Sequence, residues 1–394
     1  MQSSEDQVET RLEKRNAASR HVVIVGGGAV GLASARAALL RGYRVTVLEQ
    51  HTVPNPHGAS YDQHRMIRFQ YGEAEGYTRM VHDAFAAWSR LWADLGATHF
   101  HRTGAMGVSM QPGDYVAATA ATLASAGVGF EWLDHADMLK RVPQLKLPAE
   151  ARGLYTADGG VLFADRIVTA LAGWVLEHGA VVRERVRAES IDVARATVRL
   201  DNGETISGDH LIVAAGAWLP SLHLDDEASA ALTHGALPVW RQAVCYVAPP
   251  PRFAASWAEG PCLTDIGVGD NYALMPVGGT GLKFGSGAHR RAGTPADGFD
   301  TAPGEGYDVI RHFAPYLHDA EAYEPLRMSV GYYVKDPSER FNVQQLGNGI
   351  VVTNCDGQMF KFSALMGERV IACLDGELSG AQLSQWAAGQ WPAA

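Results

Sequence analysis

The stretch 21-HVVIVGGGAVGLASARAALLRGYRVTVLEQ-50 decides the fold class. Residues 22–25 are apolar and β-branched, which is typical of a strand buried on both faces of a parallel sheet. Gly26, Gly28 and Gly31 follow with the spacing G-x-G-x-x-G, ahead of an alanine-rich helical segment and a second apolar strand. These glycines permit a tight turn, a close backbone approach to a pyrophosphate, and close packing of the helix on the strand. The order of elements predicts a dinucleotide-binding α/β domain of the Rossmann type, and the alternative is a chance glycine-rich turn.

Glu49 closes the second predicted strand and supports the same interpretation. A carboxylate at this position accepts hydrogen bonds from both ribose hydroxyls, and it repels a 2′-phosphate. The N-terminus of the helix offers free N–H groups and a partial positive charge to the phosphates. We expect the neighbouring Ala29, Val30 and Gln50 to contact the dinucleotide as well.

A second apolar strand distinguishes FAD from NAD as the cofactor. Residues 208–218, GDHLIVAAGAW, end in A-A-G, and residues 179–208 alternate like an antiparallel meander with a DNGE turn. A second dinucleotide-type strand fed by a meander resembles flavoproteins with two fingerprints, not NAD dehydrogenases. FAD is therefore the expected cofactor, with Val186 in the strand that contacts the adenine and Gly216 in the second fingerprint.

Composition limits the class of partner and the compartment. The 394 residues carry a formal net charge of −10. Surfaces that bind nucleic acids or anionic membranes are basic, so we expect neither kind of partner. Four scattered cysteines without C-x-x-C spacing fit a reducing cytosol and predict no metal site. Residues 1–20 mix both charges, so we expect a disordered lead-in and no secretory signal, and no apolar run reaches the roughly 18 residues of a spanning helix. We expect a cytoplasmic protein that is a monomer or a small homo-oligomer.

The segment after Glu49 carries a more specific resemblance. Residues 51–73, HTVPNPHGASYDQHRMIRFQYGE, pass from a loop rich in Pro and Gly into R-x-x-R, formed by Arg65 and Arg68, and then YGE. This stretch resembles the amine-oxidising branch of the D-amino-acid-oxidase superfamily of flavoproteins, which includes monomeric sarcosine oxidase and N-methyltryptophan oxidase. The resemblance extends in order from residue 21 to about 380, through the segments RTGAMGVS (102–109), GGVLFADRIVTAL (159–171), LPVWRQAVCYV (237–247), GLKFG (281–285) and NCDGQMFKFSALMGE (354–368).

The resemblance implies the domain organisation. That family has an α/β fold, in which a Rossmann-like FAD-binding domain is interrupted by a substrate domain with a large mixed β-sheet over the flavin ring. The FAD-binding domain would take residues 21–100, 150–222 and 325–385, and the substrate domain residues 101–149 and 223–324. The active site would lie between the two.

Lys283 is the first residue to which the resemblance assigns a role. Taken alone, a lysine in a short strand such as GLKFG points to water. The resemblance instead places Lys283 at the family's lysine beside the flavin, which promotes reaction with O2. A preplaced cation in a dry site stabilises charge transferred to O2, and at 4 Å it contributes about 4 kcal/mol at an effective dielectric of 20. Arg65 matches the arginine near the flavin ring, and a structural salt bridge is the alternative for it.

Arg68 and Lys361 match the family's pair that holds the substrate carboxylate. Arginine presents a planar fork for a two-point contact, and lysine adds a point charge. Together they imply an amino-acid substrate, and structural ion pairs are the alternative. The resemblance also adds Ser60, Gly357 and Lys361 to the predicted cofactor contacts.

The chain departs from the family pattern at several pocket positions. Gly331 stands where covalent members carry the cysteine bound to the flavin, which predicts non-covalent FAD. Tyr61 and Gln358 replace two family histidines, whereas Tyr333 matches a family aromatic residue over the pocket. We expect His64 to make a local polar contact and not to replace a missing histidine. Sarcosine is therefore not the expected substrate, and a larger or differently shaped secondary amine is favoured.

These observations predict an FAD-dependent amine oxidase. A secondary amino acid, N-alkylated or cyclic, would dock on Arg68 and Lys361 and give up a hydride to the flavin. The resulting imine would hydrolyse, and O2 would reoxidise the flavin to yield H2O2, with Lys283 assisting. Two alternatives stay open: a dehydrogenase that passes electrons to another acceptor, and a protein that binds FAD without turnover.

Overall fold

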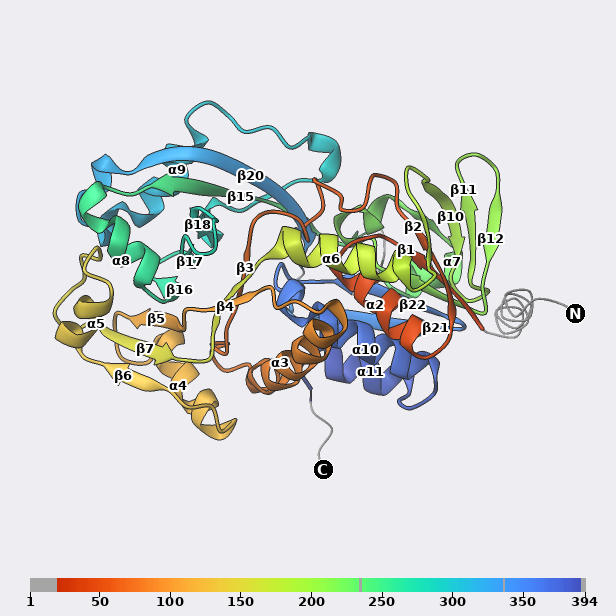
Figure 1. Cartoon of the computed structure of the whole chain (residues 1–394), viewed down its shortest axis with the longest axis horizontal. Coiled ribbons are helices and arrows are strands. Elements are labelled where there is room, and N and C mark those ends of the chain that lie inside the picture. Colours follow the sequence, from red (N-terminus) through yellow and green to blue (C-terminus); the bar gives the residue numbers. More distant parts are fainter. Residues whose placement is uncertain (1–19, 234–235, 336, 391–394) are drawn as a thin grey trace, which may run out of the picture.

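The computed structural model describes residues 20–233, 236–335 and 337–390. The expected lead-in over residues 1–20 lies outside this part except for Arg20, whose guanidinium donates to the Asp375 carboxylate at 2.7 Å. Figure 1 shows a cofactor-side sheet with its helices next to a second large sheet that curves away from it.

The cofactor-side sheet begins with the stretch that predicted it. β1 is fully buried, as its unbroken β-branched sequence requires. The strand order is β21-β22-β13-β1-β2-β9, in which every pair is parallel except β21 with β22. Its strands are β1 (His21–Val25), β2 (Arg44–Leu48), β9 (Val181–Arg183), β13 (His210–Val213), β21 (Asn342–Leu346) and β22 (Gly349–Asn354).

Helices pack closely on this sheet. α2 (Ala29–Leu40) crosses α10 (Ser363–Leu374), where a methyl group added to Gly367 would lie 2.4 Å from the carbonyl carbon of Ala33. Such an approach requires small residues at the contact, which the alanine-rich sequence of α2 supplies. The other helices on this side are α3 (Glu75–Leu95), α6 (Ala164–Glu177) and α11 (Gly380–Ala387).

The order of strands determines where a dinucleotide can bind. From β1 the chain proceeds outward through β2 and β9, whereas β13 lies on the other side of β1. This reversal opens a crevice at the carboxyl end of β1, where ligands of such sheets bind. The predicted meander is confirmed: β10 (Ala188–Asp192), β11 (Thr197–Leu200) and β12 (Thr205–Ser207) are antiparallel neighbours, and β14 (His223–Leu224) pairs with β10.

The second sheet is large and mixed, as predicted. β5 and β16 run parallel within it, whereas its other pairs are antiparallel. Its two longest strands, β15 and β20, lie side by side and reach toward the cofactor-side sheet (Figure 1). Its strands are β5 (Ala105–Ser109), β6 (Glu131–Leu133), β7 (Arg152–Thr156), β15 (Val239–Ala248), β16 (Cys262–Ile266), β17 (Asn271–Leu274), β18 (Leu282–Ser286), β19 (Arg291–Ala292) and β20 (Glu324–Val334).

Short elements complete the fold. A small sheet joins β3 (Arg65–Ile67), β8 (Gly160–Leu162) and β4 (Phe100–Arg102). The remaining α-helices are α4 (Tyr115–Ser125), α5 (His135–Arg141), α7 (Asp226–Ala231), α8 (Ala254–Glu259) and α9 (Glu305–Phe313). The predicted α/β class is thus observed. The domain boundaries stay a prediction, and β7 and β20, which fall in the ranges expected for the FAD-binding domain, pair within the large sheet.

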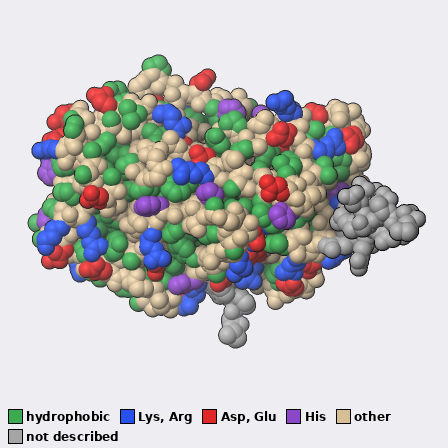
Figure 2. All heavy atoms as spheres, viewed as in Figure 1, with side chains coloured by type: hydrophobic (Ala, Val, Ile, Leu, Met, Phe, Trp, Pro, Cys, Tyr) green, Lys and Arg blue, Asp and Glu red, His purple; other side chains and the backbone are tan. Residues whose placement is uncertain are grey.

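The surface mixes charges of both signs. Lys and Arg side chains alternate with Asp and Glu over the face in Figure 2, and no broad area of one sign is visible there. Within the described ranges, no helix is long and apolar enough to cross a membrane.

The close packing of the turn after β1 leads to a testable prediction about stability. A methyl group on Gly31 would lie 1.9 Å from the carbonyl oxygen of Gly26, so we expect Gly31→Ala to cost about 1–3 kcal/mol of unfolding free energy. Gly173→Ala is the matched control, because its methyl group meets nothing within 4 Å inside α6. The control should stabilise by about 0.5–1 kcal/mol. Urea unfolding measures both, and equal effects would contradict the close packing of this turn.

Candidate active site

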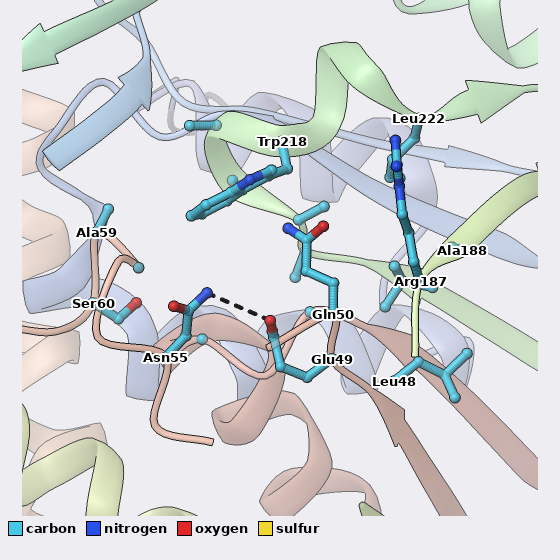
Figure 3. Close-up of a pocket in the computed structure, with 18 of the residues that line it drawn as sticks. Leu48, Glu49, Gln50, Asn55, Ala59, Ser60, Arg187, Ala188, Trp218 and Leu222 are labelled. Atoms are coloured by element: carbon cyan, nitrogen blue, oxygen red, sulfur yellow. Dashed lines mark hydrogen bonds between the residues drawn. The ribbon is translucent and has the colours of Figure 1, made fainter. Parts of the chain in front are cut away.

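A hollow lies at the carboxyl ends of β1 and β2 (Figure 3). It measures about 730 Å³, part of which is open to solvent. The loop 58–60 borders it on one side and residues 186–188 on another, and Trp218 lies across from Asn55. The predicted cofactor residues that line it are Gly26, Gly28, Glu49, Gln50, Ser60, Val186 and Gly216.

The glycine-rich turn shapes the floor of the hollow. Gly26 has φ +110°, and a methyl group there would lie 2.4 Å from the Ala214 carbonyl oxygen. α2 then begins at Ala29 with no side-chain cap from Gly28 and no acidic residue in its first turn. The Ala29 N–H donates to Ser60 Oγ at 2.9 Å, which fixes the loop over the helix end. Ser60 thus takes one N–H of the helix N-terminus, and the partial positive charge of the helix end remains to attract an anion such as a pyrophosphate.

Glu49 is held rigidly at the end of β2. Its Oε2 accepts from the Gly27 N–H at 2.8 Å, and its Oε1 accepts from the His51 N–H at 2.9 Å and from Asn55 Nδ2 at 3.4 Å (Figure 3). An ionised carboxylate has about four acceptor positions, so about one remains for a ribose hydroxyl.

These features fit the dinucleotide part of FAD. The uncapped helix end suits the pyrophosphate, Glu49 suits the ribose, and Val25, Leu48 and Trp218 supply apolar walls. Ala29, Val30 and Gly31 form the first turn of α2 behind the hollow, whereas Arg65, Gly357 and Lys361 are not among its lining residues. The role of each predicted contact remains a prediction.

The loop 58–65 connects this hollow to the large sheet. Ser60 lies at the hollow, and Arg65, where β3 begins, folds back to donate to the carbonyls of Ala59 and Tyr61. The Tyr61 side chain is half-buried in the same loop. Residues that the sequence assigned separately to the dinucleotide and to the flavin ring are therefore parts of one loop.

Lys283 faces inward on β18, so the water-facing interpretation is wrong. Its side chain is 3% exposed, and Nζ donates to Asp62 Oδ2 at 3.0 Å and to the His64 carbonyl oxygen. Burial lowers the pKa of Lys283 to about 8, although the Asp62 carboxylate opposes this change. Its partner within the protein is thus an acid that we did not predict from the sequence.

Asp62 binds more cations than Lys283 alone. Its Oδ1 accepts from Tyr246 Oη at 2.7 Å and from Arg327 Nη2 at 2.9 Å, and Arg65 Nη1 lies 3.3 Å from Oδ2. Burial alone would raise the pKa of Asp62, but Lys283 and Arg65 outweigh it and hold the pKa below the ordinary value. Asp62 is therefore an ionised, buried carboxylate among three cations.

The surroundings of the His64 ring differ from what we expected. We expected a local polar contact, but both ring nitrogens are buried without a hydrogen-bond partner among the described residues. The ring stacks on Tyr246 with centroids 5.9 Å apart. Burial, reinforced by the charge of Lys283, lowers the pKa of His64 to about 2, so this histidine is a neutral packing residue.

Arg68 and Lys361 meet around one aromatic ring. The Arg68 guanidinium lies 5.1 Å and Lys361 Nζ 5.3 Å from the centre of the Tyr71 ring. Neither cation forms an ion pair with any carboxylate in the described part; Arg68 donates to the Gln70 carbonyl, and Lys361 donates to Gln358 Oε1 at 3.4 Å. Burial and the nearby Arg68 charge hold the pKa of Lys361 well below its ordinary value. The structure therefore brings together a buried lysine and a half-buried arginine, neither of which forms an ion pair within the described residues.

Asp265 on β16 is a further acid near Arg68. Its Oδ2 is buried without a hydrogen-bond partner in the described ranges. Burial raises the pKa of Asp265 to about 6, and the charge of Arg68 opposes this change. The sequence CLTDI places one acid in a strand whose other residues are uncharged, and this pattern could have indicated Asp265.

Tyr333 lies against the turn that precedes Lys361. Gly357 has φ +63°, and a methyl group on it would lie 2.9 Å from the Tyr333 ring. Gln358, in the same turn, donates to Asp356 Oδ2 at 3.0 Å. A methyl group on Gly331 would meet nothing within 4 Å. The position expected for a covalent cysteine therefore borders open space.

Known proteins match almost the whole chain. The family described as "FAD dependent oxidoreductase" matches residues 21–373. N-methyl-L-tryptophan oxidase of Salmonella arizonae is 26% identical over 370 residues, which cover 88% of this chain and 92% of that protein. Monomeric sarcosine oxidase of Bacillus sp. is 24% identical over 364 residues, with 88% and 90% coverage. The crystal structure of L-proline dehydrogenase from P. horikoshii shares the fold, with a TM-score of 0.78 at 18% identity over 94% of this chain and 97% of that one.

The unpaired Lys361 makes a second prediction. Burial of the Lys361 amine without an ion-pair partner destabilises the folded protein, because folding must either bury its charge or remove its proton, so we expect Lys361→Met to raise the unfolding free energy by about 1–3 kcal/mol at pH 7. Because the pKa of Lys361 is lowered on folding, this gain should shrink as the pH rises toward the ordinary lysine value. Lys140→Met is the control, since Lys140 is exposed, and it should change stability little. A loss of stability in Lys361→Met would indicate a structural ion pair instead.

Proposed function

The chain belongs to the family of FAD-dependent oxidoreductases, and we propose that it oxidises a secondary amino acid, N-alkylated or cyclic, at a carbon–nitrogen bond. Membership confirms the family resemblance and FAD as the cofactor. The relatives named N-methyl-L-tryptophan oxidase and monomeric sarcosine oxidase support an amine substrate.

The pair of basic side chains around Tyr71 carries the proposal. Arg68 and Lys361 form no ion pair among the described residues, and the positive charge of a buried group such as Lys361 is costly unless a ligand compensates it. A substrate carboxylate would satisfy both, with two-point contacts to the guanidinium and a point-charge contact to the ammonium. This interaction would orient the neighbouring C–H and nitrogen in one direction.

The proposed reaction balances as two steps. The amine and O2 give an imine and H2O2, and water then hydrolyses the imine to a carbonyl compound and a smaller or ring-opened amine. FAD, when bound, supplies the acceptor for the two electrons and the hydrogen that leave the substrate carbon. The amine must be neutral for this oxidation, because its lone pair stabilises the developing positive charge on carbon.

The chain's own residues would bind, orient and supply charge. Arg68 and Lys361 hold the carboxylate, and Tyr333 closes the pocket beside the Gly357 turn. Lys283 contributes a fixed positive charge in a dry site, where reduction of O2 creates negative charge. Tyr61 and Gln358 shape the pocket for an amine larger than sarcosine.

A dehydrogenase is the second candidate. The observation that favours it is the Asp62 carboxylate 3.0 Å from Lys283 Nζ: although this anion helps to keep Lys283 protonated, it also reduces the net positive charge that the pair offers to reduced oxygen. The two candidates differ only in the electron acceptor, and they share the same substrate site.

Flavin absorbance tests the proposal. The holoenzyme is mixed without oxygen with N-alkyl and cyclic amino acids, each paired with its carboxamide as a matched control, and is then opened to air. We expect bleaching by the acids and not by the amides, followed by fast recovery in air. Slow recovery would favour the dehydrogenase, and equal bleaching by acids and amides would contradict the carboxylate site.

Variants locate the same site. Charge-assisted hydrogen bonds contribute about 1.5–3 kcal/mol, so Arg68→Met should weaken binding of the acid about 10- to 150-fold. Binding of the amide should change much less. Equal losses for both ligands would mean that Arg68 acts through the fold and not through the carboxylate.

Non-covalent attachment of FAD is part of the proposal. The four described cysteines lie elsewhere, and Gly331 borders open space. We expect acid precipitation to leave the wild-type protein colourless and the flavin in solution. In Gly331→Cys, a fraction of the flavin should stay with the precipitate, because a thiol there would face that space. Colour retained by the wild-type precipitate would contradict the non-covalent assignment.

A further inference from the structure

Asp62 occupies an unusual place beside Lys283. Its side chain is 4% exposed, and its carboxylate is the one acid among the described residues that forms an ion pair with Lys283. Arg65 and Arg327 bind the same carboxylate from the loop and from β20. The arrangement places three cations around one buried anion.

Without this anion, the charge on Lys283 would be hard to maintain. Removal from water disfavours an ammonium, and the positive charges of Arg65 and Arg327 disfavour it further. Asp62 opposes all three effects at hydrogen-bond distance. We propose that Asp62 is the positioning residue that keeps Lys283 protonated and fixed at neutral pH. The expected effect of Asp62 on the reaction with O2 rests on the proposed function of Lys283.

The strained backbone conformation of Asp62 supports a functional role for this residue. Its φ is +101°, a conformation that favours glycine and costs on the order of 1–3 kcal/mol for other residues. The strained residue is retained by contacts from both sides, since its carbonyl accepts from the Asp165 N–H at 3.0 Å and its carboxylate accepts from Tyr246 Oη. Strain that is held in this way concentrates at functional sites.

Lys283 is the group in this cluster that changes charge between pH 6 and pH 8.5. The pKa of His64 is lowered to about 2 by burial, so its ring stays neutral. Burial raises the pKa of Tyr246, and the pKa of Asp62 is held below its ordinary value, so neither titrates in this range.

The first test measures unfolding and needs no turnover. The full-length protein with saturating FAD is unfolded in urea between pH 6 and pH 8.5, as wild type, Asp62→Asn, Lys283→Met and the double variant. In Asp62→Asn the pKa of folded Lys283 falls further below its unfolded value. The loss of stability should therefore grow as the pH falls from about 8, by up to about tenfold in the equilibrium constant per pH unit. With Met at position 283, the effect of Asp62→Asn should not vary with pH.

The second test follows the flavin itself. Absorbance of the oxidised holoenzyme is titrated with pH, and the rate of reoxidation by O2 is measured over the same range. We expect a transition near pH 8 in the wild type that moves at least one pH unit lower in Asp62→Asn and is absent in Lys283→Met. Reoxidation by Asp62→Asn should be slow at neutral pH and should recover as the pH falls.

Controls separate the possible failures. Tyr246→Phe removes a hydrogen bond from Asp62 and leaves its charge, so it should lower stability without moving the transition. An effect of Asp62→Asn on stability that is independent of pH with Lys283 present would overturn the proposal. The expected unfolding result without any flavin transition would support the pairing of Asp62 with Lys283, and it would contradict the proposed place of Lys283 beside the flavin.

Discussion

One buried carboxylate connects the parts of this molecule on which the site depends. Asp62 belongs to the loop that leaves the dinucleotide hollow, yet its partners come from the large sheet: Tyr246 on β15, Lys283 on β18 and Arg327 on β20. A buried ion pair is costly unless its remaining hydrogen-bonding positions are satisfied, and here they are. The geometry between the cofactor-side sheet and the large sheet is therefore fixed by specific polar contacts as well as by apolar packing.

The fold was predictable because local sequence and tertiary structure agree. The β-branched run of β1, the glycine spacing after it, and the DNGE turn of the meander each have one strongly preferred conformation. The inward direction of Lys283 was predictable only through the family resemblance, because a lysine between Leu282 and Phe284 suits a water-facing strand equally well. Periodicity gave no means of choosing between the two.

Asp62 and the stacking of His64 show where prediction from sequence stops. Asp62 stands in YDQHR, a loop sequence in which nothing indicates burial or a positive φ. Its importance arises from residues about 185 to 265 positions away in the chain, and such contacts leave no local pattern. His64 was misjudged for the same reason, since a neighbouring polar sequence says little about a ring that packs against Tyr246 on another sheet.

The two buried lysines differ in whether they form an ion pair with the protein. Lys283 forms an ion pair with Asp62 within the protein, whereas Lys361 and Arg68 lie around one ring and form no ion pair in the described chain. At about 4 Å and an effective dielectric of 20, an opposite charge contributes about 4 kcal/mol. An anionic ligand would therefore gain more interaction energy beside Arg68 and Lys361, which form no ion pair, than beside Lys283. On the proposed function, a substrate carboxylate would bind at Arg68 and Lys361 and not at Lys283, where Asp62 would repel it. The position of one acid would thus keep the proposed site of the substrate carboxylate apart from the charge that Lys283 would offer to oxygen.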